Sequence, residues 1–315
     1  MDGQSNTVHG ATAEVACDVE LDVEYSRGGI GYTTPDPRQR PLRLDIYHPP
    51  LALREVGGRP ALILAFGGAF HRGSKEDDTV GEDGPKNTPI SEYCRRFAAR
   101  GYVCFSIDYR LIPEDPDPGT TPVLVDPDNV PRSRLDGVRR LMNLPPATSA
   151  MIANGIEAAA VDFTAAIGWV RANAVRLAVD PSRIAVGGFS AGGRSAMHAV
   201  FARQAEAAAV VCISGYLGLE ELRRHVTSGA GEPPVLALWG ERDLDYVLEQ
   251  APALVEHACT VGLPVTAHRI PGVGHFYPAS TPLAPSPSGP ATVEQAIEVF
   301  LASTLQCAGS VRPNP

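Results

Sequence analysis

The sequence lacks several patterns that would assign it to a particular class of protein. No stretch reaches the ~18 consecutive apolar residues of a membrane-spanning helix, and no run of Lys or Arg indicates binding to nucleic acid or acidic lipid. The cysteines occur without C-x-x-C spacing, so no metal site is expected. The first ten residues have neither a basic region nor an apolar core, so we expect no signal peptide and a cytoplasmic location.

The composition is that of one sizeable soluble domain. The chain has 315 residues and a formal net charge of −9, which we interpret as a solubility feature. No internal repeat is apparent, and we expect residues 1–315 to form a single domain. Cys104 and Cys212 lie in apolar runs and are expected to be buried. Cys259 and Cys307 fall in predicted C-terminal helices, and whether they form a disulfide stays open.

Short apolar segments alternate with helical patterns along most of the chain. The first two strands, at 15–25 and 42–47, are separated by a Gly/Pro-rich stretch that we predict to be a long turn or hairpin loop over 27–41. The remaining predicted elements are strands at 61–65, 102–109, 184–186, 235–239 and 265–270, and helices at 89–100, 154–174 and 292–305. This order favours an α/β fold with a mostly parallel sheet and helices on both faces.

The segment Gly188-Phe189-Ser190-Ala191-Gly192 fits the pattern G-x-S-x-G between a predicted strand and a predicted helix. That setting is typical of a nucleophile elbow, a tight turn in which only small residues fit two positions before and after the Ser. The turn also places the Ser at a helix N-terminus, where backbone N–H groups point at developing negative charge. Ser190 is therefore the candidate nucleophile.

A serine hydroxyl needs a base to take its proton and a carboxylate to orient that base. His275 lies in the Gly-rich loop after the strand at 265–270, and it is the only histidine flanked by Gly on a loop after the last strand. Asp243 follows the strand at 235–239, with Asp245 as the reserve candidate and Glu241 nearby. The chain order Ser, Asp, His is the order that α/β-hydrolases use.

An oxyanion hole requires backbone N–H donors near the nucleophile. One donor is expected from Ala191, the residue after Ser190, and the other from the loop after the strand at 61–65. That loop reads Phe66-Gly67-Gly68-Ala69-Phe70, and paired glycines allow the backbone to approach a substrate closely.

Three segments resemble α/β-hydrolases of the esterase/lipase group, which includes hormone-sensitive-lipase-like carboxylesterases and bacterial feruloyl-esterase-like enzymes. FGGAFHRGSK (66–75) resembles their H-G-G-G-[FW] loop, IDYRLIPE (107–114) their D-Y-R-L-A-P-E segment, and DPSRIAVGGFSAGG (180–193) their elbow. With the acid and histidine segments, the resemblance covers roughly residues 42 to 305. It implies the α/β-hydrolase fold, Ser190 as nucleophile, Asp243 as acid, His275 as base, and N–H donors from Gly68, Ala69 and Ala191.

The oxyanion loop departs from the family pattern at its first position. The family has a His there that anchors the loop through hydrogen bonds, whereas this chain has Phe66, which can anchor the loop only by packing. Ala69 stands in place of the third Gly. The form FGGAF matches the H-G-G-x-W loop of kynurenine formamidases about equally well, so an amidase activity stays open.

Residues 113–150 interrupt the alternation of strands and helices. They are rich in Pro and Asp and then turn apolar, and an excursion of this length is functional or disordered in most compact domains. We interpret it as a lid or pocket wall, with a solvated surface loop as the alternative. The Pro/Ser-rich segment 278–290 is interpreted as a linker. Candidate pocket residues are Phe70, Met142, Phe189 and Phe276.

The favoured function is a serine carboxylic-ester hydrolase that acts on a small to medium ester through an acyl-enzyme, without metal or other cofactor. The first alternative is an arylformamidase, amidase or acyltransferase on the same Ser-Asp-His triad. The second is a binding module that has lost catalysis, and the intact triad argues against it. The expected partner is a small molecule, and the sequence predicts neither the substrate nor the oligomeric state.

Overall fold

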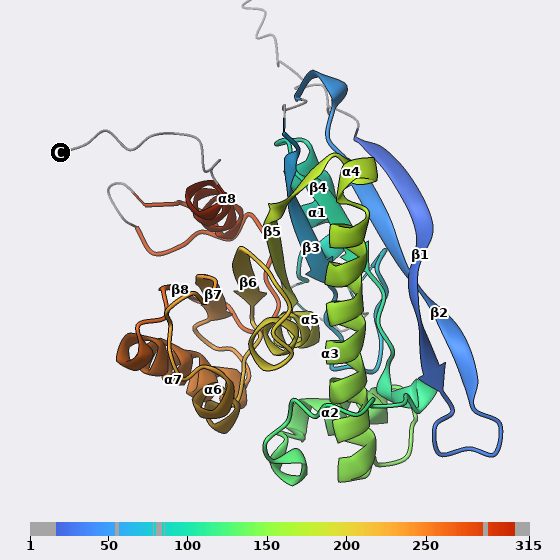
Figure 1. Cartoon of the computed structure of the whole chain (residues 1–315). Helices are drawn as coiled ribbons and strands as arrows, with labels where there is room; N and C mark the ends of the chain where they lie inside the picture. The colour runs from blue at the N-terminus through green and yellow to red at the C-terminus, as the bar shows by residue number, and fades with distance from the viewer. Residues whose placement is uncertain are drawn as a thin grey trace, which may run out of the picture.

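The computed structural model describes residues 17–53, 57–77, 79, 84, 86–285 and 289–305. Its centre is one eight-stranded sheet in the order β1-β2-β4-β3-β5-β6-β7-β8 (Figure 1). The strands are β1 (Asp18–Ile30), β2 (Arg38–His48), β3 (Arg59–Ala65), β4 (Val103–Ile107), β5 (Val179–Phe189), β6 (Ala209–Ile213), β7 (Val235–Gly240) and β8 (Val265–Ile270). The pairs β1–β2 and β2–β4 are antiparallel and the other neighbours are parallel. The predicted mostly parallel sheet is confirmed.

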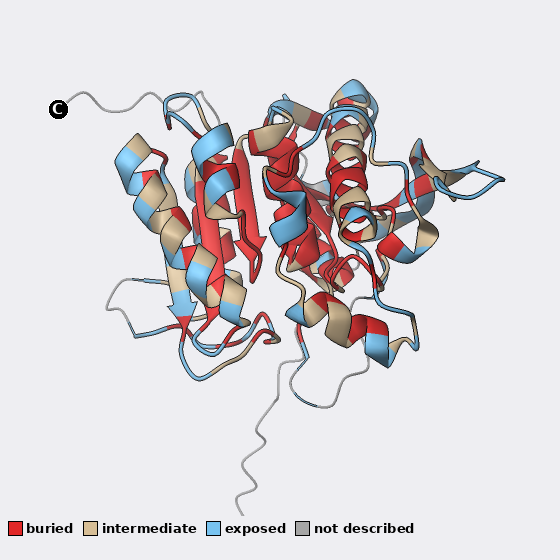
Figure 2. Cartoon of the chain, turned by 90° about the horizontal axis from the view of Figure 1, so that it is seen from below, coloured by how far each residue is buried: buried red, intermediate tan, exposed pale blue. Residues whose placement is uncertain are grey.

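Helices cover both faces of the sheet, and the strands between them are the most buried part of the chain (Figure 2). On one face, α1 (Ile90–Ala98) lies beside α8 (Val293–Thr304), where Arg96 and the neighbouring Arg100 pair with Glu294 at 2.7 and 2.6 Å. On the other face, α3 (Ser149–Ala172) contacts α5 (Ala191–Met197). The short α4 (Ala174–Leu177) follows α3, and α6 (Leu219–His225) packs against α7 (Asp245–Val261) near β7 and β8.

The predicted connection over 27–41, a long turn or hairpin loop, is a hairpin, but its loop is shorter than predicted because β1 continues to Ile30 and β2 begins at Arg38. Gly28 and Gly29 pair with Arg40 and Gln39 inside the hairpin. The glycines serve packing rather than a turn, since a Cβ on Gly28 would lie only 2.4 Å from Nε of the buried Arg110. The space left by the missing side chain therefore admits a guanidinium between the hairpin and the rest of the molecule.

The excursion 113–150 contains a helix that its Pro- and Asp-rich sequence did not predict. The excursion includes α2 (Ser133–Leu141) and the 3₁₀ turn Pro127–Asn129, and the 3₁₀ turn Ile112–Glu114 lies at its start. The carboxylate of Glu157 on α3 accepts hydrogen bonds from the N–H groups of Val123 and Leu124 at 2.7 to 3.0 Å. A buried carboxylate on a core helix thus fixes the course of this segment.

One helix in the described part of the chain, α3, has the length and composition that could cross a membrane, with a mean hydropathy of 1.3 over its best 18-residue window. The helix contains Glu157 and Asp162, so it is not an unbroken run of apolar residues. In the structure 67% of that window is buried inside the protein. The apolar character of α3 is therefore used in packing against the sheet and against α5.

The cysteines behave as small apolar side chains where the sequence predicted it. Cys104 and Cys212 are buried in β4 and β6, at 0% and 2% exposure. Cys259 is exposed on α7 with a free thiol. Cys307 lies outside the described residues, so whether it pairs with Cys259 stays open.

Candidate active site

The turn from β5 into α5 holds Ser190 in a conformation that few residues adopt. Its φ of +52° and ψ of −113° lie outside the usual regions, and its N–H donates to the carbonyl oxygen of Ile213 on β6 at 2.8 Å. Gly188 and Gly192 make this possible, because a Cβ on either would lie within 2.4 Å of the carbonyl oxygen of Ala65. The predicted nucleophile elbow is thus formed.

Ser190, His275 and Asp243 form one continuous chain of hydrogen bonds. Nε2 of His275 lies 2.9 Å from Oγ of Ser190, and Nδ1 of His275 lies 2.6 Å from Oδ1 of Asp243. A carboxylate only accepts, so Nδ1 carries the proton and Nε2 of the neutral ring is free to accept the proton of the serine. The three side chains come from the ends of β5, β7 and β8, whose carboxyl ends meet at one edge of the sheet.

Asp243 is held ionised and in place by donors on both oxygens. Oδ1 also accepts from the N–H of Leu244 at 2.8 Å, and Oδ2 accepts from Oγ of Ser214 at 2.7 Å and from the N–H of Gly240 at 3.0 Å. Burial alone would raise the pKa of this carboxyl, but the hydrogen bonds and the neighbouring His275 outweigh burial and lower the pKa. Asp243 therefore stays a carboxylate at neutral pH.

The reserve acids lie elsewhere. Asp245 is the first residue of α7, and Oε2 of Glu241 accepts from the N–H of Gly272 at 3.0 Å. Sequence reasoning missed Ser214, whose hydroxyl lies 2.9 Å from that of Tyr277. No local pattern marks these two residues, because only the folding of β6 against β7 and the His275 loop brings them together.

The oxyanion loop after β3 turns through three successive left-handed residues, Gly68, Ala69 and Phe70, with φ of +103°, +55° and +57°. The expected packing anchor is present, since the rings of Phe66 and Tyr109 stack with centroids 4.4 Å apart. The hydroxyl of Tyr109 also donates to the carbonyl oxygen of Phe66 at 2.9 Å, a hydrogen bond that the sequence did not predict. Packing and one buried hydroxyl thus hold the loop.

His71 links the oxyanion loop to the excursion 113–150. Its Nδ1 lies 2.7 Å from the carbonyl oxygen of Ala69, and its Nε2 lies 3.1 Å from Nη1 of Arg139 on α2. The carbonyl only accepts and the guanidinium only donates, so the ring is neutral with its proton on Nδ1. Burial lowers the pKa of His71, and the charge of Arg139 lowers it further despite the hydrogen bond to Ala69. Sequence reasoning missed both residues.

A cavity of about 390 Å³, counted with its mouth, opens beside Ser190. The predicted Phe70, Ala69 and Ala191 lie in its wall, and Gly68 precedes them in the loop. The excursion contributes Val130, Pro131 and Leu135, and the described lining residues are completed by Ile156, Arg194, Ser214, Tyr216 and Tyr246. The wall is therefore apolar on the side of the excursion and polar near α5.

Three predicted pocket residues are not among the described residues that line this cavity. Phe189 and Phe276 instead pack against the ring of His275, with centroids 5.2 and 5.1 Å away. Met142 follows α2 and packs against the core without lining the cavity. Phe189 and Phe276 are close to the catalytic residues in sequence, but their rings contact His275 and do not line the cavity.

The described residues contain no group of three or more His, Cys, Asp or Glu that could hold a metal ion. The site is built from a strained Ser, a His and a buried carboxylate, in the chain order Ser, Asp, His after parallel strands. The fold and the site together define a serine hydrolase of the α/β-hydrolase fold.

Comparisons with known proteins agree with this class. Residues 150–221, which contain α3 and the elbow, match the family model BD-FAE. No curated protein sequence matches the chain.

Among solved structures, the chain is similar to esterase 2 of Thermogutta terrifontis. The form phosphorylated by paraoxon is 20% identical to this chain, with a TM-score of 0.58. The alignment covers 98% of this chain and 100% of the esterase chain. The propionate-bound form is 20% identical with a TM-score of 0.56 and covers 96% and 98%. At this identity the likeness establishes the fold.

Proposed function

We propose that the protein is a serine carboxylic-ester hydrolase that works through an acyl-enzyme. The observation that carries the proposal is the unbroken chain from Oγ of Ser190 through His275 to Asp243, at 2.9 and 2.6 Å, beside a cavity. Two features support esters as the substrates. The family model matched by residues 150–221 is BD-FAE, and the similar solved structures are of an esterase.

In this proposal His275 removes the proton of Ser190 as the hydroxyl attacks the ester carbonyl. The backbone N–H groups of Gly68, Ala69 and Ala191 stabilise the resulting oxyanion. His275 then passes the proton to the leaving alcohol, and water hydrolyses the acyl-enzyme with His275 again as base. Asp243 keeps the ring in the tautomer that each step requires.

The excursion 113–150 is proposed to act as the lid of this single domain. Val130, Pro131 and Leu135 lie in the cavity wall, and Arg139 contacts His71 of the oxyanion loop. A wall that shields the acyl group from water would strengthen the electrostatic interactions in the site. The similar esterase is described with propionate and with butyrate bound, which supports short acyl groups as substrates.

The test compares the wild-type protein with Ser190→Ala on p-nitrophenyl acetate and butyrate and on an aryl formamide. We expect ester hydrolysis by the wild type and a loss on the order of 10⁴- to 10⁶-fold in the variant, with an unchanged thermal midpoint. Retained ester hydrolysis in the folded variant would refute Ser190 as nucleophile. Faster turnover of the formamide than of either ester would instead favour the amidase alternative.

A further inference from the structure

Arg194 is a buried cation in the wall of the catalytic cavity, and the mechanism above does not use it. It lies one helical turn after Ser190 on α5 and is only 4% exposed. A buried guanidinium is costly unless its charge and its N–H groups are matched. Its partners therefore indicate whether its role is structural or whether it serves a ligand.

The partners of Arg194 accept hydrogen bonds from only some of the N–H groups of its guanidinium. Nη2 donates to Oε1 of Glu221 at 3.1 Å, and Nη1 donates to the hydroxyl of Tyr216 at 2.6 Å. The guanidinium also lies over the Tyr216 ring, 4.5 Å from its centroid. Nε, in contrast, finds no acceptor among the described residues. One N–H donor of this cavity-lining cation is thus left without a partner among the described residues.

Two tyrosine hydroxyls add further donors to the same wall. Tyr216 accepts from Arg194, and no described residue accepts the proton of its hydroxyl. The ring of Tyr246 lies 5.1 Å from that of Tyr216, and its hydroxyl has no hydrogen bond to the described part of the chain. Both tyrosines line the cavity, whereas Glu221 does not. The polar end of the cavity therefore presents donors, with the balancing carboxylate behind the guanidinium.

The position of the cavity decides which part of an ester would reach these donors. Ala69 and Ala191, the expected oxyanion donors, lie in its wall together with Ser190. His275 is not among the described residues that line it. Because His275 must protonate the leaving alcohol, the alcohol lies on the histidine side, and the cavity receives the acyl group.

We propose that the polar end of the cavity binds a carboxylate at the far end of the acyl group, so that the preferred substrates are half-esters of short dicarboxylic acids. The assignment rests on the proposed ester hydrolysis. A carboxylate accepts from several donors at once, and hydrogen bonds from a charged donor to a carboxylate are about twice as strong as neutral ones. Arg194 can only donate, and the hydroxyl protons of Tyr216 and Tyr246 have no acceptor in the described part of the chain, which suits such a group.

The test compares three ethyl esters of similar shape. Monoethyl succinate carries the carboxylate, ethyl levulinate carries a neutral carbonyl, and ethyl 4-methylpentanoate carries an apolar branch. We expect kcat/KM for monoethyl succinate to exceed that for ethyl 4-methylpentanoate by at least about tenfold, the scale of one charged hydrogen bond. Equal or faster turnover of the apolar ester would overturn the proposal, and equal turnover of ethyl levulinate would overturn the assignment to a carboxylate.

Two variants locate the preference. Tyr216→Phe keeps the ring against Arg194 and removes the hydroxyl, so the ratio of succinate to 4-methylpentanoate turnover should fall several-fold. Arg194→Met combined with Glu221→Gln avoids an unpaired buried charge and should reduce the ratio to about one. Tyr32→Phe, on the exposed β1–β2 turn, is the matched control and should leave the ratio unchanged. A ratio insensitive to Tyr216→Phe and to the double variant would refute the site.

A binding measurement separates this proposal from the proposed reaction. Calorimetry on the Ser190→Ala variant compares monoethyl succinate with ethyl 4-methylpentanoate without chemistry. We expect tighter binding of the succinate half-ester, and loss of that difference when Tyr216→Phe is added. Absence of any hydrolysis by the wild type would contradict the proposed function, whereas equal binding of the two esters would contradict the carboxylate site.

Discussion

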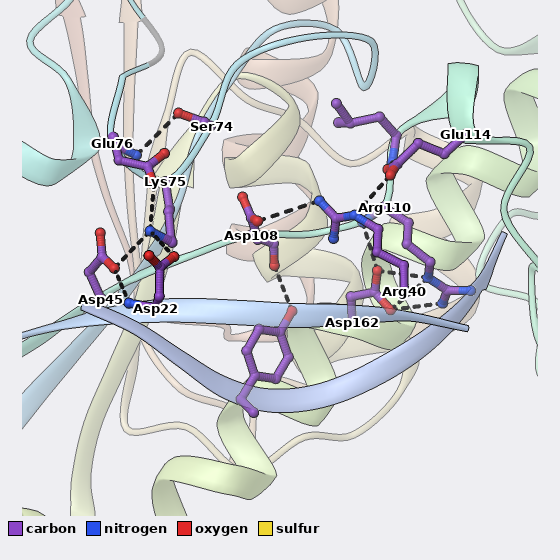
Figure 3. Close-up of polar contacts among 12 residues, drawn as sticks. Asp22, Arg40, Asp45, Ser74, Lys75, Glu76, Asp108, Arg110, Glu114 and Asp162 are labelled. Carbon is purple, nitrogen blue, oxygen red and sulfur yellow. Dashed lines mark hydrogen bonds and ion pairs between the residues drawn. The ribbon is translucent and has the colours of Figure 1, made fainter. Parts of the chain in front are cut away.

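Two buried carboxylates of this molecule look alike and serve different ends. Asp243 and Asp162 are 6% and 1% exposed, and each holds a basic side chain, His275 or Arg110. Both oxygens of Asp162 contact Arg110, at 2.7 to 3.0 Å (Figure 3). The remaining contacts of the two basic side chains separate the cases.

The other side-chain donors of Arg110 have a structural role. Its Nη1 donates to the carbonyl oxygens of Gly29 and Asp117, at 3.0 and 2.8 Å, so it joins the β1–β2 hairpin and the excursion to α3. The second nitrogen of His275 instead faces Ser190 beside a cavity. Burial and pairing alone therefore do not identify a functional group. A functional group is identified by a polar atom that faces a nucleophile or an open cavity.

Lys75 belongs with Arg110 in this respect. It is 3% exposed, and its Nζ contacts carboxylate oxygens of Asp45, Asp22 and Glu76 at 2.8, 3.1 and 2.5 Å (Figure 3). These contacts join the end of the oxyanion loop to β1 and β2. Burial lowers the pKa of Lys75, but the three carboxylates outweigh burial and raise it, so the cation persists.

The largest expected effect comes from Asp243→Asn. The amide cannot stabilise the protonated ring or enforce the tautomer of His275, so kcat should fall by about 10⁴-fold, as for the orienting acid of other triads. Stability should change little by comparison. Activity assays with thermal melts check both, and Asp245→Asn is the matched control, which should retain activity. A greater loss in the control would reassign the acid.

Asp162→Asn should show the opposite pattern. Arg110 would keep its backbone partners but lose its buried counter-charge, which destabilises proteins by about 3–5 kcal/mol. In the fraction that remains folded, kcat should stay within a few-fold of the wild type. Urea unfolding measures the first effect and rate per folded molecule the second. A large loss of kcat without loss of stability would erase the distinction between the two carboxylates.

Acid should weaken the Arg194–Glu221 pair beside the cavity. Burial raises the pKa of Glu221, but Arg194 and His198 outweigh it and hold the pKa far below its usual range. Because the pKa of Glu221 is lower in the folded than in the unfolded protein, its ionisation stabilises the fold fully above pH ~4.5. This contribution is lost as the pH falls from ~4.5 toward the folded pKa of Glu221. The stability difference between wild type and Glu221→Gln should therefore narrow by about 2 kcal/mol from pH 7 to pH 3. A constant difference would contradict an ionised Glu221.

The smallest effect is expected for Tyr109→Phe. The ring stack on Phe66 stays, while the hydrogen bond to the loop carbonyl is lost, which costs about 1 kcal/mol. A less firmly held oxyanion loop should lower kcat several-fold with little change in KM. Tyr102→Phe, which removes a hydroxyl away from the loop, is the control. Equal kinetics in both variants would show that the hydroxyl of Tyr109 is not needed to hold the loop.

The sequence predicted those parts of the site that local chemistry constrains. Ser190 requires small neighbours in a tight turn, and Asp243 and His275 follow strands whose ends must meet at one sheet edge. The partners of these residues were not predictable in the same way. Ser214 contacts Asp243 and Tyr277 across segments far apart in the chain, and no local pattern marks these contacts. The same holds for Arg139, which contacts His71, and for Tyr216, which contacts Arg194.

The structure departs from the sequence-based predictions for the same physical reason. Phe189 and Phe276 flank the catalytic residues in sequence, but side-chain direction places them against the His275 ring rather than in the cavity. Gly28 and Gly29 resemble turn residues, yet they create space for Arg110 inside a hairpin. Tertiary packing decided both outcomes, and neither is encoded in a single segment.

The most direct test of the central claim is covalent labelling by paraoxon, which phosphorylates the structurally similar esterase of Thermogutta terrifontis. We expect inactivation of the wild type with one diethylphosphoryl group per molecule, located on Ser190 by mass spectrometry of the peptides. The folded Ser190→Ala variant should take up no label. Hydrolysis of esters by a protein that paraoxon leaves unlabelled at Ser190 would contradict the account.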